Sequence, residues 1–296
     1  MPVGPQVKEF AAGTHQGMKR DHNEDCFEAN SAMNLWLVAD GVGGHSYGEV
    51  ASALVKTTIV KEVSRGEDLI TAIHAAHKAV LDEILERGDT RFNMGSTVVA
   101  MRLIDHTYDI AWVGDSRAYL WDGKSLTRLS KDHSQVGALV DQGIVSIKDA
   151  ATHPDRHVLT QSIGVSVDMC LNPGRARGTI EEGQQLLLCS DGLNDELSDE
   201  AIAVQMRGNN SPQEQVDALI NAALASGGND NVTVVVVGKP PAANDEAQVH
   251  VPDLDVTQGV ARAMLPEGNV RQERSDKIWM IVFFITMALM LLVWVA

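Results

Sequence analysis

Short runs of Val, Leu, Ile and aromatic residues recur along the first 238 positions and predict β-strands. These runs are Leu35–Ala39, Thr97–Leu103, Ile110–Val113, Ala118–Trp121, Gln185–Cys189 and Val232–Val237. In the second run every other residue is large and apolar, at Val99, Met101 and Leu103. Such alternation places these side chains on one face of a strand. We therefore expect a sheet whose two faces meet different surroundings.

Two longer segments, Gly48–Val63 and Asp68–Arg87, predict helices. In the second segment apolar residues recur at spacings of three and four, which aligns them on one side of a helix. The residues of this stripe are Leu69, Ile73, Ala76, Val80 and Ile84. Helices of this kind pack their apolar side against a sheet or another helix.

The strands that follow the two helices are joined by short gaps. Six residues separate the strand at 97–103 from that at 110–113, and four separate the latter from 118–121. Gaps of this length suit hairpins and are too short for the crossovers of a parallel sheet. A doubly wound nucleotide-binding fold is therefore disfavoured, and we expect antiparallel sheets with helices packed outside them.

The chain ends in 19 uncharged, mostly apolar residues, Ile278–Ala296. As a helix this segment is about 28 Å long, close to the hydrocarbon thickness of a bilayer. A buried core helix is the alternative, but such a helix seldom lacks a polar face over five turns. We therefore predict a folded domain at residues 1–238, a flexible juxtamembrane linker at 239–277 and a transmembrane helix at 278–296.

The composition narrows the class of protein. Lys and Arg number 24 against 40 Asp and Glu, so the formal net charge is −16. This balance argues against a nucleic-acid binder, which needs Lys and Arg to neutralise phosphates. Three widely spaced cysteines cannot form a disulfide framework and fit a reducing compartment. The first residues lack the basic and apolar regions of a secretory signal.

Acidic residues stand beside several of the predicted strands. Singly each is unremarkable, because Asp and Gly are common in turns. If the fold brings these acids together, two carboxylates 4 Å apart repel by about 4 kcal/mol at an effective dielectric of 20, so the group needs protons or cations. Oxygen ligands favour Mg²⁺ or Mn²⁺ over zinc, which prefers His and Cys. The acids concerned are Glu24, Asp25, Asp40, Asp115, Asp191 and Asp230.

Eight short motifs make a family resemblance specific. In order, between about residues 13 and 238, they are RDHNEDCF, LVADGVGGHSYGEVAS, GSTVVAMRL, VGDSRAYLW, LSKDHS, HVLTQSIG, LLLCSDGL and GGNDNVTVVVV. As an ordered set they resemble the metal-dependent Ser/Thr protein phosphatases of the PP2C type (PPM family) in their bacterial form. The resemblance implies an α+β fold, a four-layer α/β/β/α sandwich of two antiparallel sheets flanked by helices. The predicted C-terminal transmembrane helix would be added to that fold.

The resemblance also implies a centre of two Mn²⁺ or Mg²⁺ ions in the domain, with a third, weaker site. It implies that Asp40 bridges two ions and that the carbonyl of Gly41 also contributes. By the same resemblance Asp191 and Asp230 complete the ligands of the first ion. Glu24 is expected to act through a water molecule.

Further residues match the family pattern around this centre. Asp115 matches the residue that, together with Asp191, binds the third ion. Arg20 matches the arginine that binds phosphate, and Asp25 and Asn231 match residues beside the ligands. The segment from about residue 136 to residue 162 corresponds to a mobile flap beside the cleft.

The implied reaction is hydrolysis of phosphoserine and phosphothreonine on proteins, by attack of a water or hydroxide that bridges the two ions. Arg20 offers a planar fork that fits two phosphate oxygens. Eukaryotic relatives place a His directly after the Asp-Gly pair, where this chain has Val42. His45 and His133 are better explained as surface or structural residues. We therefore expect the leaving group to take its proton from a metal-bound water.

Other motif residues are expected to support the site rather than to act in it. We expect Asp132 and Thr97 to pack or to form hydrogen bonds, and Ser116 and Arg117 to be turn and sheet residues. The cysteines lie in or beside apolar stretches and are expected to be small core residues. They are Cys26, Cys170 and Cys189.

Two other functions remain as alternatives. One is a catalytically silent PP2C-like sensor or scaffold, against which the full set of acids argues. The other is a haloacid-dehalogenase-type phosphatase. That enzyme would need a second Asp two residues after Asp40, where Val42 stands.

A phosphatase of this type implies phosphorylated proteins as substrates and a cognate Ser/Thr kinase as a partner. Trp279 and Trp294 lie near the two ends of the apolar segment, and basic residues precede it. Both features are typical of a membrane span whose basic flank stays inside the cell. We therefore expect a single-pass protein of the cell inner membrane with its catalytic domain in the cytoplasm.

Overall fold

The computed structural model describes residues 9–43, 47–87, 94–150, 152–164 and 170–240. The strands are β1 (Phe10–His15), β2 (Asp25–Asn30), β3 (Leu35–Gly43), β4 (Met94–Ser96), β5 (Val98–Ile104), β6 (Thr107–Val113), β7 (Arg117–Trp121), β8 (Leu126–Arg128), β9 (Gly174–Thr179), β10 (Gln185–Cys189) and β11 (Val232–Val237). The helices are α1 (Tyr47–Ser64), α2 (Leu69–Glu86), α3 (Gln135–Asp141), α4 (Ile147–Ala150), α5 (Asp191–Asn194), α6 (Asp199–Arg207) and α7 (Pro212–Ser226).

The strands form two antiparallel sheets. One has the order β1-β11-β10-β7-β8, and the other has the order β2-β3-β5-β6-β9, with β4 paired to β3. The expected antiparallel architecture is confirmed, since neighbours in both sheets run in opposite directions. β5 and β6 form the expected hairpin, but β6 and β7 belong to different sheets. Between them the chain turns at Gly114, whose φ of 101° suits glycine.

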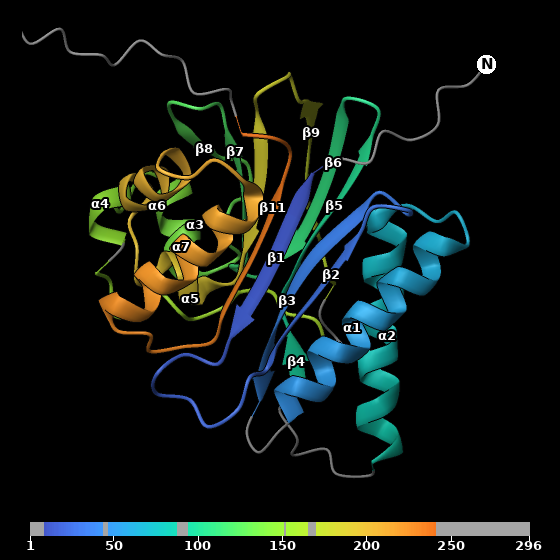
Figure 1. Ribbon diagram of the computed structural model, residues 1–296. Coiled ribbons are helices and arrows are strands. Elements are labelled where there is room, and N and C mark those ends of the chain that lie inside the picture. Colours follow the sequence, from blue (N-terminus) through green and yellow to red (C-terminus); the bar gives the residue numbers. More distant parts are fainter. Residues whose placement is uncertain (1–8, 44–46, 88–93, 151, 165–169, 241–296) are drawn as a thin grey trace, which may run out of the picture. The chain divides into compact units, whose positions relative to one another are not determined.

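The sheets pack face to face and carry helices on their outer sides, so the four-layer order predicted from the resemblance is confirmed (Figure 1). Trp36 and Met101 from one sheet and Leu188 from the other belong to the apolar layer between the sheets. The helices α1 and α2 cover the sheet that contains β3, whereas α5, α6 and α7 cover the sheet that contains β11.

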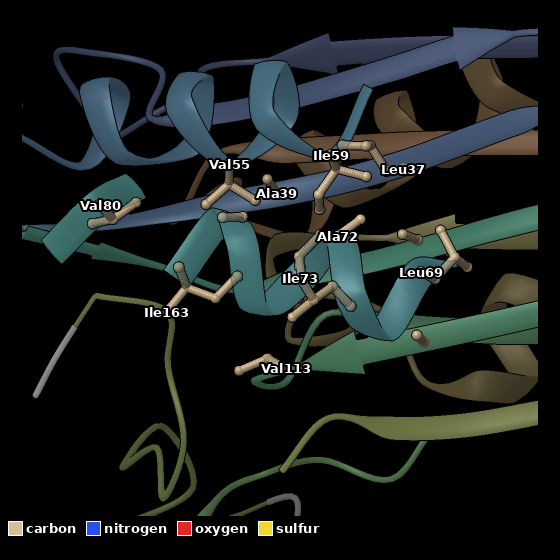
Figure 2. Close-up of a cluster of buried hydrophobic side chains, with 14 of the residues drawn as sticks. Leu37, Ala39, Val55, Ile59, Leu69, Ala72, Ile73, Val80, Val113 and Ile163 are labelled. Carbon is tan, nitrogen blue, oxygen red and sulfur yellow. The ribbon is translucent and has the colours of Figure 1, made fainter. Parts of the chain in front are cut away.

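The stripe predicted in α2 is buried as expected (Figure 2). Leu69, Ile73, Ala76 and Val80 are fully buried, and Ile84 packs against the same cluster. In the second predicted strand the alternation has the expected effect. Its large apolar residues face the other sheet, and the residues between them face the helices, apart from the half-buried Arg102.

Two expectations need correction. β3 continues beyond Ala39 to Gly43, because β4 pairs with its last residues, so Asp40 lies within the strand rather than after it. Cys189 is buried as expected and Cys26 is half-buried, but Cys170 is exposed. The expectation that all three cysteines are core residues is therefore wrong for Cys170.

The chain beyond residue 240 lies outside the described residues. It contains nearly all of the predicted linker at 239–277 and the whole of the predicted transmembrane helix at 278–296. Within the described residues, no helix has both the length and the apolar composition that crossing a membrane requires.

Candidate metal centre

A cleft of about 750 Å³ is lined by residues from both sheets and from the loops between their strands. Seven acidic side chains and two arginines line it, so acidic groups greatly outnumber basic ones in the cleft. The acids are Glu24, Asp40, Asp115, Asp191, Asp195, Glu196 and Asp230, and the arginines are Arg20 and Arg156. The structure thus brings together five of the six acids singled out from the sequence. The sixth, Asp25, lies opposite Asp40 in the β2–β3 ladder.

Asp40 is held by neighbouring strands on both sides. Its backbone N–H donates a hydrogen bond to Thr97 Oγ1 over 3.2 Å. The next residue, Gly41, donates its N–H to the carbonyl of Glu24 over 3.2 Å. A Cβ atom at Gly41 would lie 2.1 Å from the carbonyl oxygen of Gly48, so only glycine fits here. The glycine of the Asp-Gly pair is therefore required by packing within β3 and does not mark a turn.

Asn231 ties three segments of the cleft together. Its Oδ1 accepts a hydrogen bond from the N–H of Glu24 over 2.8 Å. Its Nδ2 donates to the carbonyls of Gln16 and His22, over 2.9 and 2.8 Å. Its carbonyl oxygen would lie 2.0 Å from a Cβ atom on Gly192, so the turn after Asp191 packs directly on it. Glu24, Asp191 and Asp230 are thereby brought to the same end of the cleft.

The crowding of these acids changes their protonation. Burial, and then the charges of neighbouring carboxylates, raise the pKa values of Asp40 and Asp191 well above the ordinary range. Burial raises the pKa of Asp115 to about 7 and that of Asp25 to about 6. Without a cation, therefore, the cleft keeps several carboxyls protonated close to neutral pH.

The oxygen atoms present fit a hard divalent cation. Asp25 Oδ2 accepts hydrogen bonds from Ser190 Oγ and Thr233 Oγ1, over 2.8 and 2.7 Å. Asp25 Oδ1 and Asp191 Oδ1 are both buried and have no hydrogen-bond partner among the described residues. Buried carboxylate oxygens are costly to leave unpaired, and clustered oxygen donors are the ligands that Mg²⁺ and Mn²⁺ accept.

Arg20 does not stand free in the cleft. Its Nη2 lies 2.5 Å from Asp230 Oδ2, in an ion pair that leaves about half of the arginine side chain exposed (51%). The arginine expected to bind phosphate therefore occupies one of the carboxylates expected to bind metal. The two residues are 210 positions apart, and no pattern along the chain indicated this contact.

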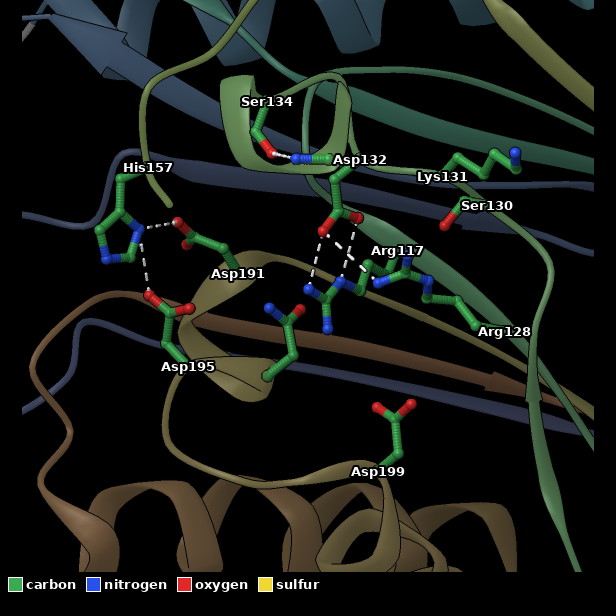
Figure 3. A network of polar contacts seen from close by, with 12 residues as sticks. Arg117, Arg128, Ser130, Lys131, Asp132, Ser134, His157, Asp191, Asp195 and Asp199 are labelled. Atoms are coloured by element: carbon green, nitrogen blue, oxygen red, sulfur yellow. Dashed lines mark hydrogen bonds and ion pairs between the residues drawn. The ribbon is translucent and has the colours of Figure 1, made fainter. Parts of the chain in front are cut away.

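Two further residues lie beside Asp191 and were not singled out from the sequence (Figure 3). His157 Nδ1 is 3.4 Å from Asp195 Oδ2 and 4.0 Å from Asp191 Oδ2. Ligand atoms of these three residues lie within 4.8 Å of one another, close enough to hold an ion. Asp195 follows Asp191 by four residues, the spacing of one helical turn, and this signal could have found it. His157 offered no comparable pattern.

The two histidines considered as proton donors have different outcomes. His133 accepts a hydrogen bond from the N–H of Gly114 at Nδ1, over 3.3 Å, and stacks on Trp112. It does not line the cleft, which supports its structural role. His45 lies outside the described residues. Of the segment compared with a flap, residues 156, 157 and 159–162 line the cleft.

Comparison with known proteins gives matches over most of the folded domain. A sequence profile described as "Protein phosphatase 2C" matches residues 12–225. The serine/threonine protein phosphatase PstP of Mycobacterium tuberculosis is 36% identical over 239 residues, which are 78% of this chain and 45% of PstP. The chain thus spans about half the length of that relative. The serine/threonine phosphatase stp of Listeria welshimeri is 33% identical, over 76% of this chain and 93% of stp.

A crystal structure of the catalytic domain of PstP in complex with two manganese ions is also similar. It superposes with a TM-score of 0.70 at 32% identity, covering 79% of this chain and 99% of that domain.

Proposed function

The chain belongs to the protein phosphatase 2C family of metal-dependent Ser/Thr protein phosphatases, and we propose that it hydrolyses phosphoserine and phosphothreonine on proteins. The observation that carries the proposal is the cleft in which carboxylates from distant parts of the chain converge with raised pKa values. Such crowding is tolerated where divalent cations replace the protons. Members of the family use Mn²⁺ or Mg²⁺, and the cluster of oxygen donors suits either.

We propose the metal ligands from the family resemblance, and the convergence of these acids in one cleft supports the proposal. Asp40 with the Gly41 carbonyl, Asp191 and Asp230 would hold two ions, with Glu24 acting through water. Asp115 with Asp191 would hold a third, and Asp25 and Asn231 would orient the ligands. When bound, such ions supply an activated water as nucleophile and neutralise charge on the phosphate.

Arg20 would bind the phosphate through its two terminal nitrogens. In this structure one of them is paired with Asp230, so Arg20 must leave Asp230 before it can turn to a substrate. Cations held by the cleft would favour that change, because Asp230 would then have another positive partner. The protein's own arginine thus exchanges one anionic partner for another.

The direct test removes one carboxylate charge at a time. We expect Asp40→Asn and Asp191→Asn each to lower turnover of p-nitrophenyl phosphate by about a thousandfold, since ions at such sites supply several kcal/mol. Both variants should also retain fewer Mn²⁺ ions per molecule by elemental analysis. Asp21→Asn, in an exposed position of the same loop as Arg20, serves as the matched control. Full turnover by both cleft variants would show the assignment to be wrong.

A catalytically silent scaffold of the same fold is not favoured, because the cleft keeps its full set of acids. The assay with p-nitrophenyl phosphate and millimolar Mn²⁺ separates the two functions. A silent module would bind the ions and release no product.

We also propose that residues 278–296 tether the domain to the cytoplasmic face of a membrane, close to phosphorylated proteins and their kinase. Support comes from the sequence, in which these 19 residues carry no charge. The variant Ile285→Lys/Leu289→Lys should move the full chain from the membrane fraction to the supernatant, because each buried lysine opposes insertion. Retention of this variant in the membrane fraction would contradict the tether.

A further inference from the structure

A buried pair of hydroxyl groups joins the two sides of the acidic cleft. Thr97 Oγ1 and Ser116 Oγ lie 2.7 Å apart, and both residues are 1% exposed. Thr97 stands between β4 and β5, and Ser116 directly precedes β7. The pair therefore connects one sheet to the loop by which the chain crosses into the other sheet.

Thr97 is fixed against Asp40 by two backbone contacts. Its N–H donates to the carbonyl of Asp40 over 2.8 Å, and its Oγ1 accepts from the N–H of Asp40 over 3.2 Å. The hydroxyl of Thr97 can accept this bond and still form a second one with Ser116, in which either hydroxyl can donate. The chain of contacts thus runs from the backbone of Asp40 through Thr97 to Ser116.

Ser116 in turn follows Asp115, and its loop lies directly against Thr97. A Cβ atom at Gly114 would be 2.6 Å from Thr97 Cγ2, so the loop has no room to shift toward β5. Asp115 itself is almost fully buried, at 8% exposed. The residues on either side of Asp115 therefore restrict its position, together with His133, which bonds to Gly114, and the hydroxyl pair links its loop to Asp40.

We propose that the hydroxyl bridge between Thr97 and Ser116 holds Asp115 at a fixed position relative to Asp40, which makes both hydroxyl residues positioning residues for the third ion. The inference rests on the function proposed above, because it uses the assignment of Asp40 and Asp115 to different ions. The bridge contributes by orientation, as groups behind the ligands do in other metal sites.

The first test needs no metal. In the metal-free protein, Ser116→Ala removes the bridge and keeps the contact between Thr97 and Asp40. We expect amide hydrogen exchange at Asp115 and Ser116 to become about tenfold faster, because the loop loses a buried hydrogen bond. Ser130→Ala is the matched control, since Ser130 is also a buried hydrogen-bonded serine and bonds to Ala118 instead. Unchanged exchange in Ser116→Ala would overturn the proposal.

The second test measures Mn²⁺ binding by titration calorimetry. We expect Ser116→Ala to weaken the weakest class of site about tenfold and to leave the tighter ions unchanged. Thr97→Ser keeps the hydroxyl and should match the unmodified protein, whereas Thr97→Val should weaken the same site at least as much as Ser116→Ala does. Equal weakening of every site in Ser116→Ala, or weaker binding by Thr97→Ser than by the unmodified protein, would overturn the bridge.

The variant Asp115→Asn distinguishes a failure of the bridge proposal from a failure of the metal assignment on which it rests. If the weakest ion remains bound in Asp115→Asn, the assignment of Asp115 to the third ion fails, and with it the proposed role of the bridge in metal binding. The exchange measurement on the metal-free protein still decides whether the bridge holds the loop.

Discussion

Two groups of largely buried acids, one around Asp132 and one in the cleft around Asp40 and Asp191, are neutralised differently. Asp132 accepts hydrogen bonds from Arg117 Nε and Nη2, over 3.1 and 2.7 Å, and lies 3.5 Å from Arg128 (Figure 3). Asp40 and Asp191, in contrast, have pKa values raised by burial and then by the charges of the other carboxylates around them. The same residue type is therefore a structural anchor in one region and a ligand candidate in the other.

The difference teaches how to recognise a cation site among buried acids. A carboxylate that is paired with an arginine is already neutralised, so an added cation stabilises it little. Carboxylates whose nearest charged neighbours are other carboxylates stay unneutralised until they bind protons or cations. The identity of the partner separates the two regions, whereas burial, which both share, does not.

The largest expected effect is on the stability of the metal-free protein, through acids in and beside the cleft that have no basic partner among the described residues. Unfolded aspartates titrate at about 3.9, whereas in the fold burial raises the pKa of Asp25 to about 6 and that of Asp115 to about 7. Between these values the folded state holds more protons than the unfolded state, so stability falls as the pH rises. We expect a loss on the order of 5 kcal/mol between about pH 4 and pH 7.

Urea midpoints measured over this pH range in the presence of a chelator would show the decline. Millimolar Mn²⁺ should flatten it, because cations then replace the protons. Asp25→Asn should lose part of the slope, since it removes one of the titrating groups. A midpoint that rises with pH in the metal-free protein would contradict the comparison.

A second prediction concerns the ion pair between Arg117 and Asp132. Arg117→Met leaves the carboxylate of Asp132 largely buried, with 13% of its side chain exposed and its strongest partner gone. We expect the free energy of unfolding to fall by about 3 kcal/mol, as measured by urea denaturation with Mn²⁺ present.

The control for this prediction removes both charges. Arg117→Met combined with Asp132→Leu should recover most of the loss, because no buried charge then remains unpaired. A double variant less stable than Arg117→Met would show that the pair does more than neutralise itself.

The smallest expected effect is on substrate binding by Arg20. This arginine is intermediate between the two groups, because it pairs with Asp230, one of the acids of the cleft. Arg20→Ala should raise KM for a phosphopeptide about tenfold, because a bidentate phosphate contact is lost. It should also tighten Mn²⁺ binding modestly, because Asp230 no longer has a competing partner. Lys19→Ala, at an exposed neighbouring position, controls for the loss of surface charge. A lower KM in Arg20→Ala would contradict its role.

The strands and helices with strong apolar patterns could be predicted from the sequence, and those at the edges of the sheets could not. β10 and β11 are wholly buried and read as continuous apolar runs. β9, GRARGT, is an edge strand that alternates between half-buried and exposed positions and has no such run. α7 was also missed, although Ser211, Pro212 and Glu214 form a helix-start signal, and Ser211 Oγ accepts from the N–H of Glu214.

Five of the seven acids that line the cleft could be anticipated, because short motifs place each of them beside a strand and the family resemblance joins them. The pairing of Arg20 with Asp230 and the approach of His157 to Asp191 could not. Both contacts depend on how loops that are distant in the sequence pack in space. The spacing of residues along the chain does not indicate such contacts.

The positions of the cysteine thiols bear on the sensitivity of the protein to oxidation. No cysteine is among the residues that line the described cleft, and burial raises the pKa of the Cys189 thiol to about 12. Peroxide inactivates enzymes that depend on an accessible thiolate, because that form is the one that reacts readily. A cleft that uses carboxylates and an arginine has no thiolate of this kind, so we expect the proposed phosphatase activity to persist at peroxide concentrations that inactivate thiol-dependent phosphatases.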